Sequence, residues 1–122
     1  MYISKDDSDN QVRKQLKSSP AKRDNQYLLS GFIRLHVLHH AAKEPVIGFW
    51  MMQELQRHGY RMSAGTLYPL LHGLEKRGCL TSIQKREGRR SWREYRATLA
   101  GKKSLATAKE KLKELFHELI EE

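Results

Sequence analysis

The apolar side chains between residues 26 and 78 recur at helical spacing, and two breaks, Pro45 and Gly59, divide them into three short segments. The first segment predicts a helix over residues 26–42, because its apolar positions fall on one helical face. The second predicts a shorter helix that ends near Gly59, since a glycine commonly follows the last turn of a helix. The third predicts a helix over residues 64–77.

The third predicted helix carries signals at both of its ends. Ser63 stands where its hydroxyl would cap the first turn, and Gly78 stands where the helix would stop. Pro69 falls in the second turn, where its missing backbone N–H predicts an irregular or slightly bent start.

From Leu80 the spacing of apolar residues changes from helical to strand-like. Two short runs, residues 80–86 and 91–98, flank a glycine-containing turn at residues 87–90, which predicts a β-hairpin with a basic tip. Residues 80–98 carry six basic and two acidic side chains, a net charge of +4. Arginine side chains in such a patch can grip phosphate oxygens through their planar fork of donors. The alternative explanation of this basic patch is a solvated face that binds no partner.

Residues 99–122 predict one long helix that is capped by Thr98. Its apolar side chains alternate three and four residues apart, which is the spacing of a coiled-coil seam. The expected dimerisation residues are Leu105, Ala108, Leu112, Leu115, Phe116 and Leu119. One small domain has little surface with which to cover such a face, so we expect a second copy of the chain to cover it.

The chain of 122 residues carries a net charge of +9, and the whole excess lies before residue 99, because residues 99–122 hold five Lys and five Glu. Such a charge favours a polyanionic partner, with nucleic acid ahead of a membrane surface. Residues 1–25 are polar and lack the apolar stretch of a secretory signal. No apolar run approaches the length of a membrane span. We therefore expect a cytoplasmic protein with no membrane partner.

Three helices, a hairpin and a long final helix are the elements of a winged helix-turn-helix followed by a dimerisation helix. The predicted fold is therefore mainly α with a small β-hairpin. We expect a flexible polar arm over residues 1–25, the winged helix-turn-helix domain over residues 26–98 and the dimerisation helix over residues 99–122.

Three short motifs are specific enough to compare with known families. They are Gly-Thr-Leu-Tyr-Pro-Leu-Leu at residues 65–71, Gly-Phe-Ile-Arg-Leu at residues 31–35 and Tyr-Arg-Ala-Thr at residues 95–98. These motifs resemble those of the PadR-type transcriptional regulators, and the resemblance covers residues 27–119. Because only a helix's length of chain follows the hairpin, the sequence resembles the short type, which has a single C-terminal helix.

The resemblance implies a sequence-specific DNA-binding transcriptional regulator, a repressor, that acts as a homodimer on a pseudo-palindromic operator. The third helix would lie in the major groove of double-stranded DNA, and the hairpin would reach the flanking backbone or minor groove. The expected DNA-binding residues are Ser63, Thr66, Tyr68, His72, Lys85, Arg86, Arg89, Arg90 and Arg93. For Tyr68 the alternative is packing against the second helix. A winged-helix protein-interaction module and a non-specific nucleic-acid binder are the alternative functions.

A few residues have both a functional and an ordinary explanation. His36, His39 and His40 have a spacing that can hold a metal ion, but we favour ordinary, partly exposed histidines, and we expect no metal site and no cofactor. Cys79, the single cysteine, excludes an internal disulfide and is expected to be a small core side chain, with a redox-sensing thiol as the alternative. The chain shows no catalytic motif, so we do not expect an enzyme.

Trp50 and Trp92 could bind an aromatic ligand or could serve only in packing. Trp50 is expected in the core or at the dimer contact, and Trp92 is expected to cover the hairpin. Members of the family that the chain resembles bind flat aromatic molecules, some of them between two subunits. The resemblance therefore implies a small aromatic effector, whose identity nothing in the sequence reveals.

Overall fold

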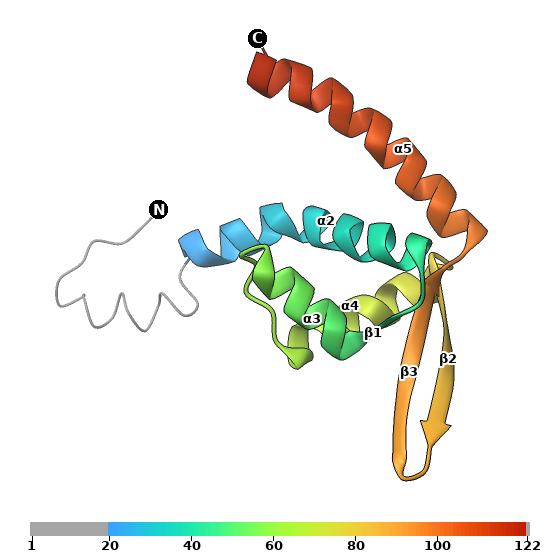
Figure 1. Ribbon diagram of the computed structural model, residues 1–122. Helices are drawn as coiled ribbons and strands as arrows, with labels where there is room; N and C mark the ends of the chain where they lie inside the picture. The colour runs from blue at the N-terminus through green and yellow to red at the C-terminus, as the bar shows by residue number, and fades with distance from the viewer. Residues whose placement is uncertain (1–19, 122) are drawn as a thin grey trace, which may run out of the picture. The chain divides into compact units, whose positions relative to one another are not determined.

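The computed structural model describes residues 20–121, with side chains from residue 25 onward. Its elements follow the predicted order of three helices, a hairpin and a final helix (Figure 1). Their bounds are α2 Pro20–Lys43, β1 Val46–Ile47, α3 Gly48–Arg57, α4 Ala64–Lys76, β2 Leu80–Glu87, β3 Arg90–Ala97, α5 Leu99–Phe116 and a π-helical turn His117–Glu121. The chain divides into two compact units, Met1–Phe32 and Ile33–Glu122, whose boundary lies inside α2. Most of the expected arm, residues 1–19, lies outside the described residues.

α2 begins at Pro20 rather than at the predicted residue 26. Proline is well tolerated at the first helical position, because the backbone N–H there has no partner within the helix. The residues before Tyr27 are polar and carry no apolar stripe, so spacing alone does not extend the helix to them. Within the first unit, the side chains of Tyr27, Leu28 and Phe32 are exposed.

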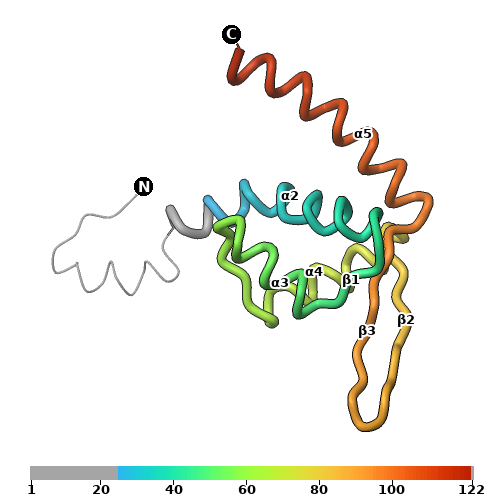
Figure 2. The backbone as a smooth tube through the Cα atoms, in the orientation of Figure 1, coloured from blue at the N-terminus to red at the C-terminus, as the bar shows by residue number. Residues whose placement is uncertain are grey.

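The second unit has one hydrophobic core, whose side chains come from the C-terminal half of α2, from α3 and α4, from the base of the sheet and from the start of α5. Figure 2 traces the backbone of these elements. Its buried members are Val37, Leu38, Ala41, Val46, Met51, Leu55, Met62, Leu67, Leu71, Leu74, Leu80, Tyr95 and Leu105. Residues from β1, α3, α4, β2, β3 and α5 thus meet those of α2 in one place, which sets α4 and the hairpin on a common base.

Two glycines end helices as the sequence predicts. Gly59 has a φ of +92° and Gly78 a φ of +82°, a backbone region that favours glycine. Both turns carry the two backbone hydrogen bonds of a Schellman motif. In the first turn, Gly59 donates to Gln56 and Tyr60 donates to Leu55. In the second, Gly78 donates to Glu75 and Cys79 donates to Leu74. α4 runs without interruption across Pro69 and ends at Lys76, one residue before its predicted end.

The predicted hairpin is present, and one further strand pairs with it. β2 and β3 are antiparallel from Leu80 opposite Ala97 to Glu87 opposite Arg90, and Gly88 in the tight turn has a φ of +65°. This hairpin, residues 80–97, is the wing. β1 pairs with the other edge of β3, so the strand order is β1-β3-β2. The sequence does not predict β1, because two residues cannot show an alternating pattern.

The start of α5 is fastened to the turn that follows α4. Thr98 is the N-cap, as predicted, and its Oγ1 accepts a hydrogen bond from the backbone N–H of Gly101 at 2.9 Å. The same hydroxyl donates to the carbonyl of Gly78 at 2.6 Å, and the N–H of Thr98 donates to the carbonyl of Cys79 at 3.0 Å. These bonds fix where α5 leaves the winged domain.

The far end of the final helix departs from the prediction of one continuous α-helix. α5 ends at Phe116, and residues 117–121 form a π-helical turn. A π-helical turn is wider than an α-helical one, so the three-and-four spacing of the predicted seam loses its register there. Leu119, the last predicted seam residue, lies in this turn.

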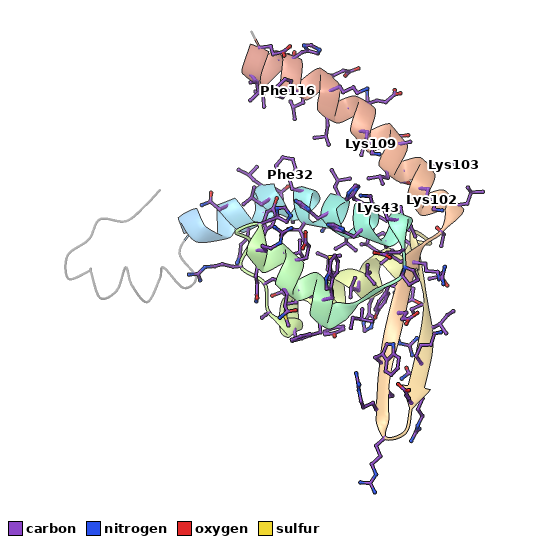
Figure 3. The ribbon with its side chains drawn as sticks, viewed as in Figure 1. Phe32, Lys43, Lys102, Lys103, Lys109 and Phe116 are labelled. Carbon is purple, nitrogen blue, oxygen red and sulfur yellow. The ribbon has the colours of Figure 1, made fainter. Side chains whose placement is uncertain are left out.

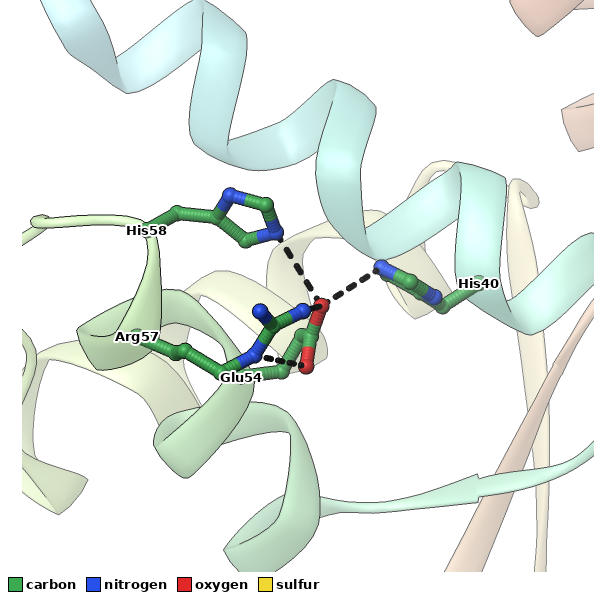
Figure 4. Close-up of polar contacts among 4 residues, drawn as sticks. All are labelled: His40, Glu54, Arg57 and His58. Carbon is green, nitrogen blue, oxygen red and sulfur yellow. Dashed lines mark hydrogen bonds and ion pairs between the residues drawn. The ribbon is translucent and has the colours of Figure 1, made fainter.

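A polar cluster connects α2 to α3 (Figure 4). The carboxylate of Glu54, whose side chain is 10% exposed, accepts a hydrogen bond from Arg57 at 2.8 Å and lies 3.1 Å from Nε2 of His58 and 3.6 Å from Nε2 of His40. The hydrogen bond from Arg57 holds the pKa of the Glu54 carboxyl below its usual value. Burial lowers the pKa of His40 and of His36, whose ring centroid lies 4.7 Å from that of His58.

Candidate nucleic-acid interface

The start of α4 presents polar side chains that were expected to face DNA. Ser63 and Thr66 are exposed there, and His72 is exposed further along the helix. Ser63 occupies the N-cap position, as predicted, but its hydroxyl makes no capping bond and donates instead to Oγ1 of Thr66 at 3.3 Å. The predicted capping role of this hydroxyl is therefore wrong. Both hydroxyls remain at the open end of α4.

Tyr68 lies on the same part of α4 but packs against α3. A β-carbon placed on Gly48 would lie 2.7 Å from Cζ of the Tyr68 ring, so the ring covers the first residue of α3. The side chain is nevertheless 37% exposed. Tyr68 therefore packs on the second helix of the helix-turn-helix, as the alternative explanation expects, and still presents part of its surface; its contact with DNA stays a prediction.

The wing carries its positive charge near its tip. Lys85, Arg86, Arg89 and Arg90 are all exposed. Two of them have contacts within the hairpin: Nε of Arg86 donates to the carbonyl of Gly88 at 3.3 Å, and the guanidinium of Arg90 lies 5.5 Å from the centroid of the Trp92 ring. Four exposed positive side chains on a narrow ribbon can follow a row of phosphate oxygens.

Trp92 is expected to cover the hairpin, and its ring makes its contacts within the hairpin. It is half-buried, stands opposite Lys85 in the strand register and donates from its ring N–H to Glu94 at 3.2 Å.

Arg93, the fifth basic residue predicted to contact DNA from the wing, has partners on β2. Its Nη1 donates to Oγ of Ser82 at 3.0 Å and its Nη2 donates to Oε1 of Gln84 at 2.8 Å. Ser82 in turn donates to Glu75 of α4 at 2.7 Å. No local pattern in the sequence joins Ser82 to Glu75, because the two residues lie in different elements.

The predicted dimerisation residues fall into two groups. Leu105 belongs to the core of the second unit, and Ala108 is half-buried. The exposed members are Leu112, Leu115, Phe116 and Leu119, and Ile120 is exposed beside them. Phe116 and Lys109 both project from the later turns of α5 (Figure 3). The apolar stripe of α5 is therefore open beyond its first turns.

The possible metal ligands, Cys79 and Trp50 each have two explanations in the sequence, and the structure bears on all of them. Within residues 25–121, no three metal-ligating side chains come together in a way that could hold an ion. Cys79 is half-buried and packs against the core, as a small core side chain would. Trp50 is not a core residue, because 41% of its surface is exposed. Its helix presents Met51 and Leu55 to the core, and Trp50 lies on another face.

Among the described helices, none is long and apolar enough to cross a membrane.

Comparison with known proteins agrees with this geometry. A model of the transcriptional regulator PadR-like family matches residues 37–107, which run from α2 through the winged domain into α5. Transcriptional regulator Rv3488 of Mycobacterium tuberculosis is 52% identical over 88 residues, which cover 72% of this chain and 82% of that protein.

Solved structures show the same fold. A PadR family transcriptional regulator from Eggerthella lenta superposes with a TM-score of 0.70 at 28% identity, over 83% of this chain and 89% of that one. A PadR-like transcriptional regulator from Bacillus cereus has the same fold, with a TM-score of 0.66 at 24% identity over 73% and 88% of the two chains. The chain described here belongs to the PadR-like family of transcriptional regulators, and it is a DNA-binding regulator.

Proposed function

We propose that this protein is a repressor that binds double-stranded DNA as a homodimer, at an operator with two inverted half-sites. The observation that carries the proposal is that one compact unit presents two suitable surfaces, the polar start of α4 and the exposed basic tip of the wing. α4 would enter the major groove with Ser63 and Thr66 toward the base edges. The wing would lie along the flanking backbone or minor groove.

The two surfaces would have different tasks. Lysine and arginine on the wing neutralise phosphates, which supplies affinity for any sequence and makes binding depend steeply on salt. Hydroxyl groups on α4 discriminate weakly between bases, so specificity would also depend on DNA shape and on half-site spacing. The proposed contact residues are Ser63, Thr66, Tyr68 and His72 on α4, and Lys85, Arg86, Arg89, Arg90 and Arg93 on the wing.

The open apolar stripe of α5 supports the homodimer. Its exposed members, from Leu112 to Leu119, would be covered by the same residues of a second copy across a two-fold axis. Such a dimer presents two copies of α4 to two half-sites about one helical turn apart. Repression requires only that the bound dimer occupies the operator.

We also propose a site for an aromatic effector. A surface pocket of about 330 Å³ is lined by His40, Lys43, Glu44, Pro45, Val46, Ile47 and Trp50. The indole of Trp50 meets the ring of His40 edge-on, with 5.2 Å between centroids, which leaves an aromatic face for stacking. The ammonium of Lys43 would pair with an acidic group on the ligand.

Fluorescence tests the effector site. Benzoate should quench the emission of Trp50 in a Trp92→Phe variant more strongly than uncharged benzamide does, and a Lys43→Ala variant should remove the difference. Unchanged emission with both compounds would count against the pocket.

Selection of bound fragments from a pool of genomic DNA tests the main proposal. The purified protein should recover a short inverted repeat and bind it tightly at physiological salt. Fragments without a common motif, bound with an affinity that collapses as salt rises, would indicate a non-specific nucleic-acid binder. Retention of no DNA, together with affinity for an acidic protein, would indicate a protein-interaction module.

A wing variant tests how DNA is held. Arg89→Ala combined with Arg90→Ala should weaken binding and reduce the slope of log K against log salt by about 0.9 for each lost phosphate contact. Lys102→Ala with Lys103→Ala is the matched control, because it removes the same charge from the first turns of α5 (Figure 3). Equal effects of the two variants would contradict the role of the wing.

A further inference from the structure

A continuous chain of hydrogen bonds connects α4 to the wing. Oγ of Ser82 donates to Oε2 of Glu75 at 2.7 Å and accepts from Nη1 of Arg93 at 3.0 Å. Nη2 of Arg93 donates to Oε1 of Gln84 at 2.8 Å, and Gln84 lies directly opposite Arg93 in the strand register. The chain therefore runs from the helix to β2, across to β3 and back to β2. We call Glu75, Ser82, Arg93 and Gln84 the strut.

The strut joins opposite charges through one hydroxyl group. Ser82 and Glu75 are half-buried, so their hydrogen bond is partly shielded from water. Hydrogen bonds to ionised groups are shorter and stronger than those between neutral groups. Burial and, after it, the charge of Glu75 raise the pKa of the buried Tyr95, while Arg93 opposes this effect. Both charged members of the strut thus act electrostatically on the same buried phenol.

The wing has few other contacts that fix its direction. β1 pairs with β3 only at Tyr95 and Glu94, so the ribbon is two-stranded beyond its base. A two-stranded ribbon is barely stable by itself in water. Only the base of this ribbon reaches the core, through Leu80 and Tyr95, whereas β2 is exposed from Ile83 to its end at Glu87. The direction of the tip relative to α4 therefore depends on contacts near the base, which is where the strut lies.

Glu75 is the last residue but one of α4 and carries a negative charge. A carboxylate on the proposed recognition helix repels the phosphates of DNA, so it lowers affinity unless it has another task. Its hydrogen bond to Ser82 supplies such a task.

The geometry points to Glu75 and Ser82 as positioning residues, which hold the wing at a set angle to α4 so that both elements reach one DNA molecule together. This inference rests on the proposed DNA-binding function. Neither residue needs to touch DNA. Within the described part of the chain, the strut uses two of the five N–H donors of Arg93, so donors remain for a phosphate.

Removal of the central hydroxyl is the first test. Ser82→Ala should weaken binding to the selected operator about three- to tenfold, which is the range for the loss of one or two hydrogen bonds. The salt slope should stay at the wild-type value, because no phosphate contact is lost. Ser82→Thr keeps the hydroxyl and should restore the affinity. Thr81→Ala is the matched control, since Thr81 is the exposed neighbour on the opposite face of β2.

Neutralisation of Glu75 gives a second test, in which the inference depends on whether DNA affinity falls or rises. Loss of a negative charge near DNA normally strengthens binding, and Glu87→Gln at the exposed end of β2 should do so. Glu75→Gln removes the same charge but should weaken binding, because it also weakens the strut. Stronger binding by both variants would overturn the inference.

Hydrogen exchange in the absence of DNA separates this inference from the proposed function. The amides of residues 83–93 should exchange faster in Ser82→Ala than in the wild type or in Thr81→Ala, because a loosened ribbon opens more often. Wild-type exchange together with wild-type affinity would overturn the strut. If the wild type binds no DNA, the proposed function fails, and hydrogen exchange alone decides whether the strut holds the wing.

Discussion

The ring of Tyr68 on α4 occupies the space in which a side chain at Gly48 on α3 would begin. A β-carbon at Gly48 would lie 2.7 Å from both Cε1 and Cζ of that ring, well inside the contact distance of two carbon atoms. Gly48 is itself buried and is the first residue of α3. Glycine at this position therefore allows the two helices of the helix-turn-helix to approach each other closely.

This contact predicts an energetic coupling between the two residues. Gly48→Ala should lower the free energy of unfolding by about 1–3 kcal/mol, because the new methyl group overlaps the ring. In a Tyr68→Ala background the same change should cost much less, since the ring is absent. Urea unfolding of the four proteins at one protein concentration measures the coupling. Equal costs in both backgrounds would show that the clash is not with Tyr68.

Gly101 in α5 is also predicted to resist substitution, although alanine has the higher helix propensity. A β-carbon on Gly101 would lie 3.0 Å from the carbonyl carbon of Cys79 and nearer still to its oxygen, which is held by the N–H of Thr98. Gly101→Ala should therefore lower the free energy of unfolding by about 1–3 kcal/mol. Gly73→Ala, which meets no atom within 4 Å, should raise it by about 0.5–1 kcal/mol. A gain in stability at both positions would contradict the close contact at Cys79.

Dimer formation through α5 is predicted to depend on its open apolar stripe. Leu112→Glu with Leu115→Glu should give monomers in sedimentation, because two carboxylates cannot be buried unpaired between identical faces. Lys103→Gln with Thr107→Glu changes the net charge by the same amount on the opposite side of the helix and should leave the dimer intact. A dimer that survives the leucine substitutions would place the subunit contact elsewhere.

Acid is predicted to weaken the junction of α2 and α3. Burial lowers the pKa of His36 and His40, so the folded protein binds fewer protons at these sites than the unfolded chain does. Stability is therefore full above the ordinary histidine pKa of about 6.5 and falls as the pH drops below it. His58 and His39 add to the effect on His36, and Glu54 opposes it.

The melting temperature at about pH 7.5 and about pH 5.5 measures this effect, because histidine is the side chain that titrates in that interval. His36→Gln with His40→Gln should reduce the difference between the two temperatures. A difference as large as that of the wild type would assign the pH dependence to other groups.

Much of the local structure is determined by neighbouring residues in the sequence. Gly59 and Gly78 end their helices in Schellman turns, Gly88 makes the tight turn of the hairpin, and Thr98 caps α5, all as predicted. These features depend on backbone conformations and hydrogen bonds that span only a few residues, so composition and spacing are enough to predict them. The basic tip of the wing is predictable for the same reason.

The sequence predicts local structure less well where a short segment can adopt several conformations. Ser63 has the residue type and the position of an N-cap, yet its hydroxyl bonds to Thr66. The start of α2 lies at Pro20, before any apolar stripe begins, and β1 is too short to show a strand pattern. In each case a short polar or two-residue segment carries too little signal to choose one conformation.

Only the tertiary structure decided which distant residues meet. Glu75 reaches Ser82 because the turn at Gly78 folds β2 back beside α4, and Arg93 joins them only through the register of β2 and β3. Tyr68 meets Gly48, and Gly101 meets Cys79, because packing of the core brings their backbones together. Spacing and turn residues thus determined the order of elements, composition determined the charge of the wing, and three short motifs carried the resemblance to the family. The contacts that join α4 to the wing come from long-range packing, which no local pattern encodes.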